Sequence, residues 1–228
     1  MKITIKKEVF SKFPELKVAF IKVEKIKNHH DWLESTHLLR EMEELVRLSF
    51  NKDNYQSHQL IAPWVVARRE FGSQAKQYHT SVELLLKKVI HHHRIIAPDT
   101  LTNLLHYLSL KYILPLGADD ICKLNGNIIF SLASGEEKIK SREKLISNAL
   151  YYRDQKQVLG TKLDYWKNEK TALTKESSSV LIHVECLPPC TSLKLKSVLS
   201  EAQKLIRTFC GGKVKMVLLS RKKSSASI

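Results

Sequence analysis

The hydrophobic residues of this 228-residue chain follow a helical period in the first half and a strand period in the second half. Between residues 31 and 112, apolar side chains recur about every three or four positions, which is the spacing of one helix face. From about residue 121 onward, short β-branched and aromatic runs are separated by turns rich in Gly, Asn, Ser and Glu. This change of period predicts an α+β fold, with helices mainly in the N-terminal half packed on a mixed or antiparallel β-sheet from the C-terminal half.

The same periodicity places the individual elements. Thr80 followed by Glu83 predicts a capping box at the start of one helix, and Gly211–Gly212 ends the last one. We expect helices over residues 31–50, 59–72, 80–94, 101–112 and 192–209, and strands over 2–6, 17–24, 127–133, 149–154, 157–166, 179–185 and 213–220. Without an internal repeat or linker, residues 1–220 are predicted to form one domain, followed by a disordered basic and serine-rich tail at 221–228.

Basic residues outnumber acidic ones by 38 to 23, which gives a formal net charge of +15. This excess favours a polyanionic partner, and nucleic acid rather than membrane, because no strongly amphipathic basic helix stands alone. The basic residues are spread along the chain, which also fits a merely solvated surface. No apolar run is long enough for a transmembrane helix, and MKITIKKEVF lacks the apolar stretch of a signal peptide, so a cytoplasmic protein is expected.

The four cysteines, Cys122, Cys186, Cys190 and Cys210, contain no C-x-x-C pair. We therefore expect free, buried thiols rather than a metal site. The adjacent histidines at 91–93 point in different directions on a helix and chelate poorly, so no metal is expected there either. The sequence has no glycine-rich phosphate loop and no nucleophile elbow, and no cofactor is expected.

Two stretches carry polar groups in unusual places. Asn103, His106 and Tyr107 lie on an otherwise apolar helix, where a buried polar group costs free energy unless it is paired. The acidic residues Asp164 and Glu169 lie beside aromatic residues, near the end of the predicted strand 157–166 and in the segment after it. A partly desolvated carboxylate of this kind can act as a base or bind an amine. From the residues alone, the simpler interpretation of this second stretch is a surface turn with a solvated carboxylate.

The order of three segments changes the weight of these alternatives. RREFGSQAKQYHTSVELLLKKV is followed by LTNLLHYLSLKYILPLGADDICKLNGNIIFSLASGEE and then by YYRDQKQVLGTKLDYWKNEKTALTKESSSVLIHVE. In this order and spacing they resemble the B3/B4 domain, the amino-acid editing domain of the phenylalanyl-tRNA synthetase beta subunit, and more closely the stand-alone proteins built from that domain. The resemblance runs from about residue 14 to residue 220. Because no aminoacylation module fits in these 228 residues, it implies binding or editing rather than amino-acid activation.

The resemblance carries over to the site position by position. Where the family's helix has an Asp and, three residues later, an Asn, this chain has Asn103 and His106. The turn LPLG follows at 114–117, and the synthetase commonly has a histidine at the position of Gly117. By spacing, the synthetase's editing glutamate falls on Glu169. The Trp-Asn-Trp run of the stand-alone group is replaced by LDY at 163–165, which implies a different pocket and a different amino acid.

These matches imply a tRNA-binding trans-editing factor that hydrolyses the ester of a mischarged aminoacyl-tRNA, with the tRNA acceptor end as its partner. Glu169 would anchor the substrate's ammonium group or orient the attacking water, while Asn103 and His106 would donate hydrogen bonds to carbonyl or hydroxyl groups. The other expected pocket residues are Gly117, Leu116, Tyr107, Asp164, Tyr165 and Trp166, and the expected nucleic-acid contacts are Lys87, Lys88, Lys167 and Lys170. The alternatives are a non-catalytic tRNA- or RNA-binding module and a small-molecule amino-acid binder.

Overall fold

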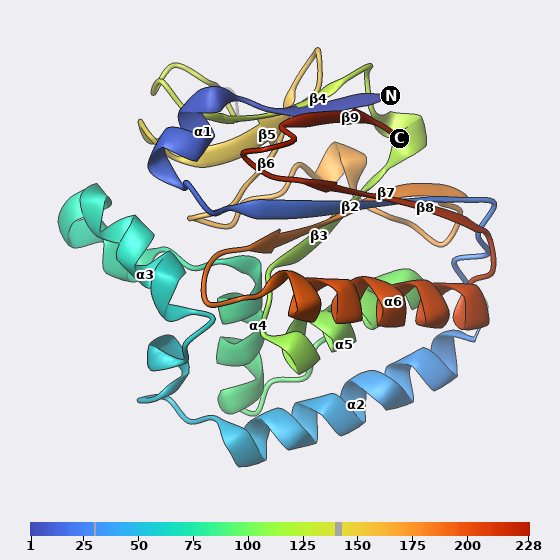
Figure 1. The fold of residues 1–228 in the computed structure, drawn as a ribbon. Coiled ribbons are helices and arrows are strands. Elements are labelled where there is room, and N and C mark those ends of the chain that lie inside the picture. The colour runs from blue at the N-terminus through green and yellow to red at the C-terminus, as the bar shows by residue number, and fades with distance from the viewer. Residues whose placement is uncertain (30, 140–142) are drawn as a thin grey trace.

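The chain folds into two stacked β-sheets with a layer of helices on one side (Figure 1). This computed structural model describes residues 1–29, 31–139 and 143–228. The five-stranded sheet has the order β6-β5-β4-β1-β9, and the four-stranded sheet has the order β3-β7-β2-β8. The first sheet consists of β1 (Lys2–Ile5), β4 (Ile128–Leu132), β5 (Leu150–Arg153), β6 (Val158–Thr161) and β9 (Ser225–Ser227). The second consists of β2 (Lys17–Glu24), β3 (Leu116–Asp120), β7 (Ser179–Cys186) and β8 (Lys213–Leu219).

Helices α2, α4, α5 and α6 form the layer on the outer face of the four-stranded sheet, while α1 lies beside the five-stranded sheet (Figure 1). The helices are α1 (Lys7–Lys12), α2 (Trp32–Ser49), α3 (Ala62–Arg68), α4 (Ser81–Ile90), α5 (Thr100–Tyr112) and α6 (Ser192–Phe209), and the 3₁₀ turns are η1 (Tyr55–Ser57), η2 (Arg69–Gln77), η3 (Ile121–Lys123) and η4 (Glu169–Thr171). None of the helices in the described ranges is long and apolar enough to cross a membrane.

Alternation along β2 divides the hydrophobic core into two parts. Val18 and Phe20 pack toward the five-stranded sheet, whereas Ala19 and Ile21 pack toward the helices. β2 lies between β7 and β8 and is antiparallel to both. Because successive side chains of a strand point to opposite faces, and both faces are covered, β2 and β7 are apolar along most of their length.

The predicted α+β class is confirmed, and the capping box is present at the start of α4. The largest difference is β3, which forms where the sequence predicts only a turn. Ile113 ends α5 in a left-handed conformation (φ 54°), and the chain then runs along the edge of β7. Gly117 and Asp119 are poor strand formers, so tertiary pairing rather than intrinsic propensity decides the conformation here.

The prediction of a disordered tail at 221–228 is wrong for its last residues. β9 pairs antiparallel with β1, and the backbone N–H of Ile228 donates to the carbonyl of Met1 (3.0 Å). The free edge of β1 presents unpaired backbone groups that an extended segment can bond to without apolar side chains of its own. The two ends of the chain therefore lie close together (Figure 1).

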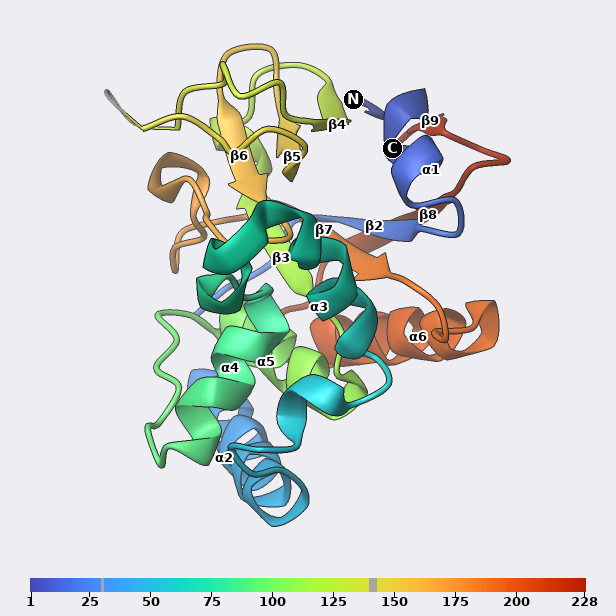
Figure 2. The same ribbon diagram turned by 90° about the vertical axis from the view of Figure 1, so that its left-hand side faces the viewer.

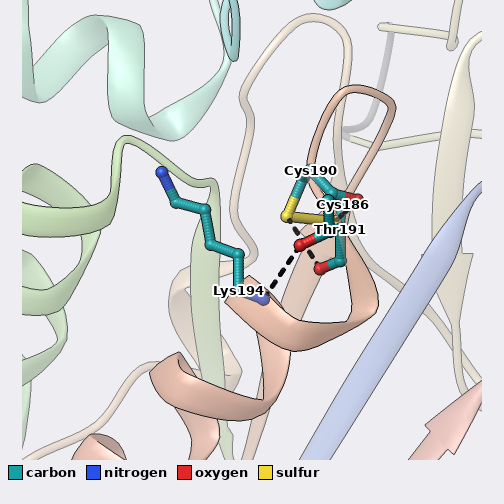
Figure 3. The surroundings of a disulfide bond; sticks show 4 residues. All are labelled: Cys186, Cys190, Thr191 and Lys194. Carbon is teal, nitrogen blue, oxygen red and sulfur yellow. Dashed lines mark hydrogen bonds between the residues drawn. A yellow bond between two sulfur atoms is a disulfide. The ribbon is translucent and has the colours of Figure 1, made fainter.

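The prediction of four free, buried thiols is also wrong. A disulfide joins Cys186 and Cys190 in the turn between β7 and α6 (Figure 3). Their α-carbons lie 6.0 Å apart, within the usual range for a disulfide. The turn brings these two residues together, although their spacing is not that of a C-x-x-C motif. Cys122 is free and exposed, and Cys210 is free and buried.

Candidate functional site

A pocket of about 360 Å³ opens between α4, α5, the edge strand β3 and the segment 165–173. We call it the α4–α5 pocket, and Figure 2 shows the two helices next to β3. Its wall is mainly apolar, and its volume suits a small ligand or one end of a larger one. The lining residues are Ser81, Leu84, Leu85, Lys88, Ile95, Ile96, Pro98, Thr102, Leu105, His106, Ser109, Leu116, Gly117, Ala118, Tyr165, Lys167, Ala172 and Leu173.

His106 is the one histidine among the described residues that line this pocket. Its Nδ1 atom is buried and has no hydrogen-bond partner among the described residues. Burial, and after it the charge of Lys88, lowers the pKa of His106 to about 4. The imidazole is therefore neutral at pH 7. The neutral ring keeps one N–H donor and one acceptor nitrogen, and His106 is part of the pocket lining.

Both charged side chains in the lining are cationic. Lys88 is exposed near the end of α4, and Lys87, Arg94 and the histidines at 91–93, which are close to it in sequence, are exposed as well. Lys167 forms an ion pair with Asp119. No Asp or Glu of the described chain lines the pocket. Its mouth is therefore electropositive and suited to an anionic partner.

A buried charge network lies behind β3, between the two sheets. His183 and Glu185 of β7 point to this side, and Lys162 reaches it from the end of β6. The Glu185 carboxylate lies 2.9 Å from Lys162 Nζ and 2.8 Å from His183 Nδ1. Burial alone raises the pKa of Glu185, but the charge of Lys162 and the contact with His183 outweigh it and lower this pKa to about 2. Glu185 is therefore ionised, and burial together with Lys162 lowers the pKa of His183.

The network continues from His183 to the α4–α5 pocket. His183 Nε2 lies 3.2 Å from the hydroxyl of Tyr152 on β5, and that hydroxyl donates to Asp119 Oδ2 on β3 (2.9 Å). Lys167 ion-pairs with Asp119 and donates to Thr171 Oγ1 (2.8 Å). Lys167 thus belongs both to the pocket lining and to the network, so the network fixes one wall of the pocket.

Gly117 packs directly against the ring of His183. A Cβ atom at this position would lie 2.2 Å from His183 Cε1 and 2.6 Å from His183 Nε2. The space left by the glycine is therefore occupied by the histidine. Gly117→Ala is expected to lower the free energy of unfolding by about 1–3 kcal/mol, because it forces a fully packed ring to move. Urea denaturation at pH 7 measures the change.

The His183→Ala background provides the control for this substitution. Without the ring, the added methyl group has room, so Gly117→Ala should cost clearly less there than in the natural chain. An equal loss of stability in the two backgrounds would show that the ring is not the reason for glycine at this position.

The structure brings part of the predicted site together. The predicted residues that line the α4–α5 pocket are His106, Leu116, Gly117, Tyr165, Lys88 and Lys167. Those outside the lining are Asn103, Tyr107, Asp164, Trp166, Glu169, Lys87 and Lys170. The functional roles given to all of these residues stay predictions.

Two residues outside the lining connect α5 to other helices. Asn103 Nδ2 donates to Ser35 Oγ (3.0 Å) and Thr36 Oγ1 (2.9 Å) of α2. The hydroxyl of Tyr107 donates to Glu201 of α6 (3.4 Å). The polar groups of α5 are therefore divided between helix packing and the pocket, and those that line the pocket are Thr102, His106 and Ser109.

The other outlying residues come from the segment after β6 and from the surface. Trp166 packs against a small core around Tyr151, and burial raises the pKa of Asp164. Glu169 is the first residue of η4 and is exposed, although Ala172 and Leu173 shortly after it line the pocket. Lys87 and Lys170 are exposed.

Sequence reasoning missed both the buried network and much of the apolar wall. In SVLIHVEC, His183 and Glu185 alternate with apolar residues, and polar groups at alternate positions of a buried strand indicate a paired polar layer. That signal could have predicted the network. Wall residues such as Ile96 and Leu173 come from connections far apart in sequence, and no local pattern indicates that they meet.

The sequence and the structure were compared with known families and known structures. The family model described as the B3/4 domain matches residues 64–211, which is more than half of the chain. Among solved structures, the chain is similar to an N-terminal fragment of the phenylalanyl-tRNA synthetase beta subunit from Pyrococcus horikoshii, with 10% sequence identity and a TM-score of 0.47. The match covers 95% of this chain and 53% of that one, so the chain spans about half the length of the fragment. No curated protein matches the sequence.

Proposed function

Because the chain belongs to the B3/4 domain family, we propose that it binds tRNA and hydrolyses the ester of a mischarged aminoacyl-tRNA at the α4–α5 pocket. The observation that carries the proposal is the pairing of an apolar pocket, which is lined by the neutral imidazole of His106, with a basic surface at its mouth. The amino-acid end of the substrate would enter the pocket. The phosphates of the acceptor end would lie on Lys87, Lys88 and the neighbouring basic residues.

Hydrolysis of an aminoacyl ester requires few catalytic groups, because the ester is already activated. Catalysis then needs a positioned water and hydrogen bonds to the oxyanion that develops on the carbonyl. With a pKa of about 4, His106 is too weak a base to take a proton efficiently at pH 7. We therefore give His106 a hydrogen-bonding role toward the ester or the water. No covalent nucleophile is part of the proposal.

The substrate's ammonium group needs an anionic partner, and no carboxylate of the described residues lines the pocket. Glu169 is the predicted acceptor, and it stands a short distance along the chain from Ala172 in the pocket wall. Its exposed position at the start of η4 leaves its carboxylate free to turn toward a bound ligand. Lys167 and Lys170 flank it in sequence and would contact phosphates.

The test is a deacylation assay on a broad panel of mischarged tRNAs. His106→Leu is expected to slow ester hydrolysis by about 100-fold, the usual loss when one donor to an oxyanion is removed. Glu169→Ala should raise KM and slow the reaction as well. His37→Leu, at an exposed position on α2, is the matched control and should leave the rate unchanged. Absence of hydrolysis of every tRNA in the panel by the natural protein would contradict the deacylase proposal.

A second candidate is a non-catalytic tRNA-binding module. It is favoured by the positions of Asn103 and Glu169 outside the pocket lining. It predicts tRNA binding that weakens steeply with salt, survives His106→Leu and Glu169→Ala, and is accompanied by no hydrolysis. Filter binding on the same variants separates it from the deacylase. An amino-acid binder would instead show heat of binding with free amino acids in the absence of tRNA.

A further inference from the structure

A second groove lies at the C-terminal end of α5, shares no lining residue with the α4–α5 pocket and has no part in the proposed function. Its volume is about 500 Å³, and it is formed by α2, η1, the end of α5 and the start of α6. We call it the α2–α6 groove. Its lining residues are Met42, Leu45, Val46, Ser49, Phe50, Asn54, Ser57, His58, Leu110, Lys111, Ile113 and Lys194.

The α2–α6 groove combines an apolar wall with basic groups. Met42, Val46, Phe50 and Leu110 contribute to the apolar part. The charged or titratable side chains in the lining are His58, Lys111 and Lys194, and no carboxylate of the described residues is among them. A groove of this kind fits a ligand with an apolar body and a negative head group.

Lys194 is the cation in this groove without a counter-ion. Its side chain is half-buried, and its ammonium group has no hydrogen bond or ion pair within the described part of the chain. Burial lowers its pKa, and no acidic group offsets the effect. Figure 3 shows the side chain extending from the first turn of α6 away from the disulfide. A partly desolvated ammonium without a partner gains free energy when an anion binds beside it.

Lys111 differs from Lys194 because its charge is already balanced. Lys111 Nζ lies 2.6 Å from Glu201 Oε1 and also donates to the hydroxyl of Tyr107 (3.2 Å). The attraction for an anion in the groove is therefore concentrated at Lys194.

His58 supplies a second donor near Lys194. Its pKa is lowered by burial first and then by the charge of Lys194, so the ring is neutral at pH 7, and both side chains line the groove. The backbone N–H of Leu60 donates to His58 Nδ1 (3.3 Å). The proton of the neutral ring is therefore on Nε2, which can donate to an anion.

We propose that the α2–α6 groove binds a small amphipathic anion. A carboxylate or phosphate monoester head would contact the Lys194 ammonium and His58 Nε2–H, and a short apolar body would lie on Met42, Phe50 and Leu110. The groove is separate from the α4–α5 pocket, so the inference does not depend on the deacylase proposal.

The experiment uses calorimetric titration of the whole chain with octanoate and octyl phosphate, and with octanol and octylamine as the neutral and cationic counterparts. Saturable binding of at least one anion is expected, with octanol and octylamine at least about tenfold weaker, since a charge-assisted hydrogen bond is lost. The preferred anion then distinguishes a carboxylate from a phosphate ligand. Amide chemical-shift changes confined to the groove residues would support the location.

Lys194→Gln should weaken binding of the preferred anion at least about tenfold, while Lys196→Gln should not. Lys196 is the matched control because it lies on the same helix, is exposed and carries the same charge. His58→Asn should weaken binding less than Lys194→Gln and provides a second variant. Equal binding of octanol and octanoate, or an equal effect of the two lysine substitutions, overturns the proposal.

Discussion

Replacing Glu185 with Gln is expected to lower the free energy of unfolding by about 3–5 kcal/mol, the usual loss when one partner of a buried ion pair is removed. Gln has nearly the shape of Glu, so the change removes charge without leaving a cavity. It would leave the Lys162 ammonium, which is only 7% exposed, without a carboxylate of the described residues within hydrogen-bonding distance. His183 would lose its contact with a carboxylate as well. Urea denaturation at pH 7 measures the loss.

Glu136→Gln is the matched control for this substitution. Glu136 pairs with Lys144, and the two side chains are 79% and 47% exposed. An exposed pair of this kind contributes about 0–1 kcal/mol. If Glu185→Gln destabilised the protein no more than Glu136→Gln, the network behind β3 would not contribute to the stability of the fold.

The pH dependence of stability provides a second measure of the same pair. The folded-state pKa of Glu185 is about 2, below its ordinary value of 4.5. Its contribution is therefore complete above pH 4.5 and is lost as the pH falls from 4.5 toward 2, because the unfolded chain binds the proton first. The stability of the natural protein should fall more steeply in this range than that of Glu185→Gln.

The sequence predicts the fold class and many of the elements because their signals are local. The expected strand at 17–24 coincides with β2 (Lys17–Glu24), and the expected helix at 192–209 coincides with α6 (Ser192–Phe209). β3 and β9 were not predictable in this way. Both depend on backbone pairing with a strand distant in sequence, β7 for one and β1 for the other. Their own residues, mainly Gly, Asp, Ser and Ala, show no strand pattern.

The same limit applies to the candidate site: some of its residues could be predicted from the sequence, but contacts between distant segments could not. The resemblance to the B3/B4 domain placed His106, Leu116 and Gly117 together, and they do line one pocket. It could not predict that Asn103, one turn from His106, bonds to α2, because that contact depends on how the helices pack. It also could not predict that the space beside Gly117 is filled by His183, which lies on a strand far away in sequence. Such contacts follow from tertiary packing and not from a motif.

Glu83→Ala is expected to have an effect of the same size as Glu185→Gln, about 3–5 kcal/mol of lost stability, because it also leaves a buried cation unpaired. The two guanidinium nitrogens of Arg68 lie 2.6 and 2.7 Å from the Glu83 carboxylate. Both residues are fully buried. The same carboxylate accepts from the backbone N–H and the hydroxyl of Thr80 (2.8 Å each), so the substitution removes the cap of α4 as well.

The effect of Glu83→Ala should extend to the α4–α5 pocket. Arg68 ends α3 and Glu83 lies in the first turn of α4, next to the pocket residues Ser81 and Leu84. Burial raises the pKa of Glu83, but its hydrogen bonds and the charge of Arg68 outweigh this and lower it to about 2, so its contribution is also lost as the pH falls from 4.5 toward 2.

Two variants separate the parts of this effect. Glu83→Gln keeps an acceptor for Thr80 but removes the charge, so a smaller loss than for Glu83→Ala isolates the contribution of the cap. Glu44→Ala is the exposed control, since the Glu44 side chain is 70% exposed and pairs with Arg47 on the surface of α2; it should cost at most about 1 kcal/mol.

Because α4 provides one wall of the pocket and the cap fixes where that helix begins, Glu83→Ala should also weaken whatever the α4–α5 pocket binds. Unchanged tRNA affinity and unchanged stability in Glu83→Ala would together mean that α4 is held in place by its apolar face alone.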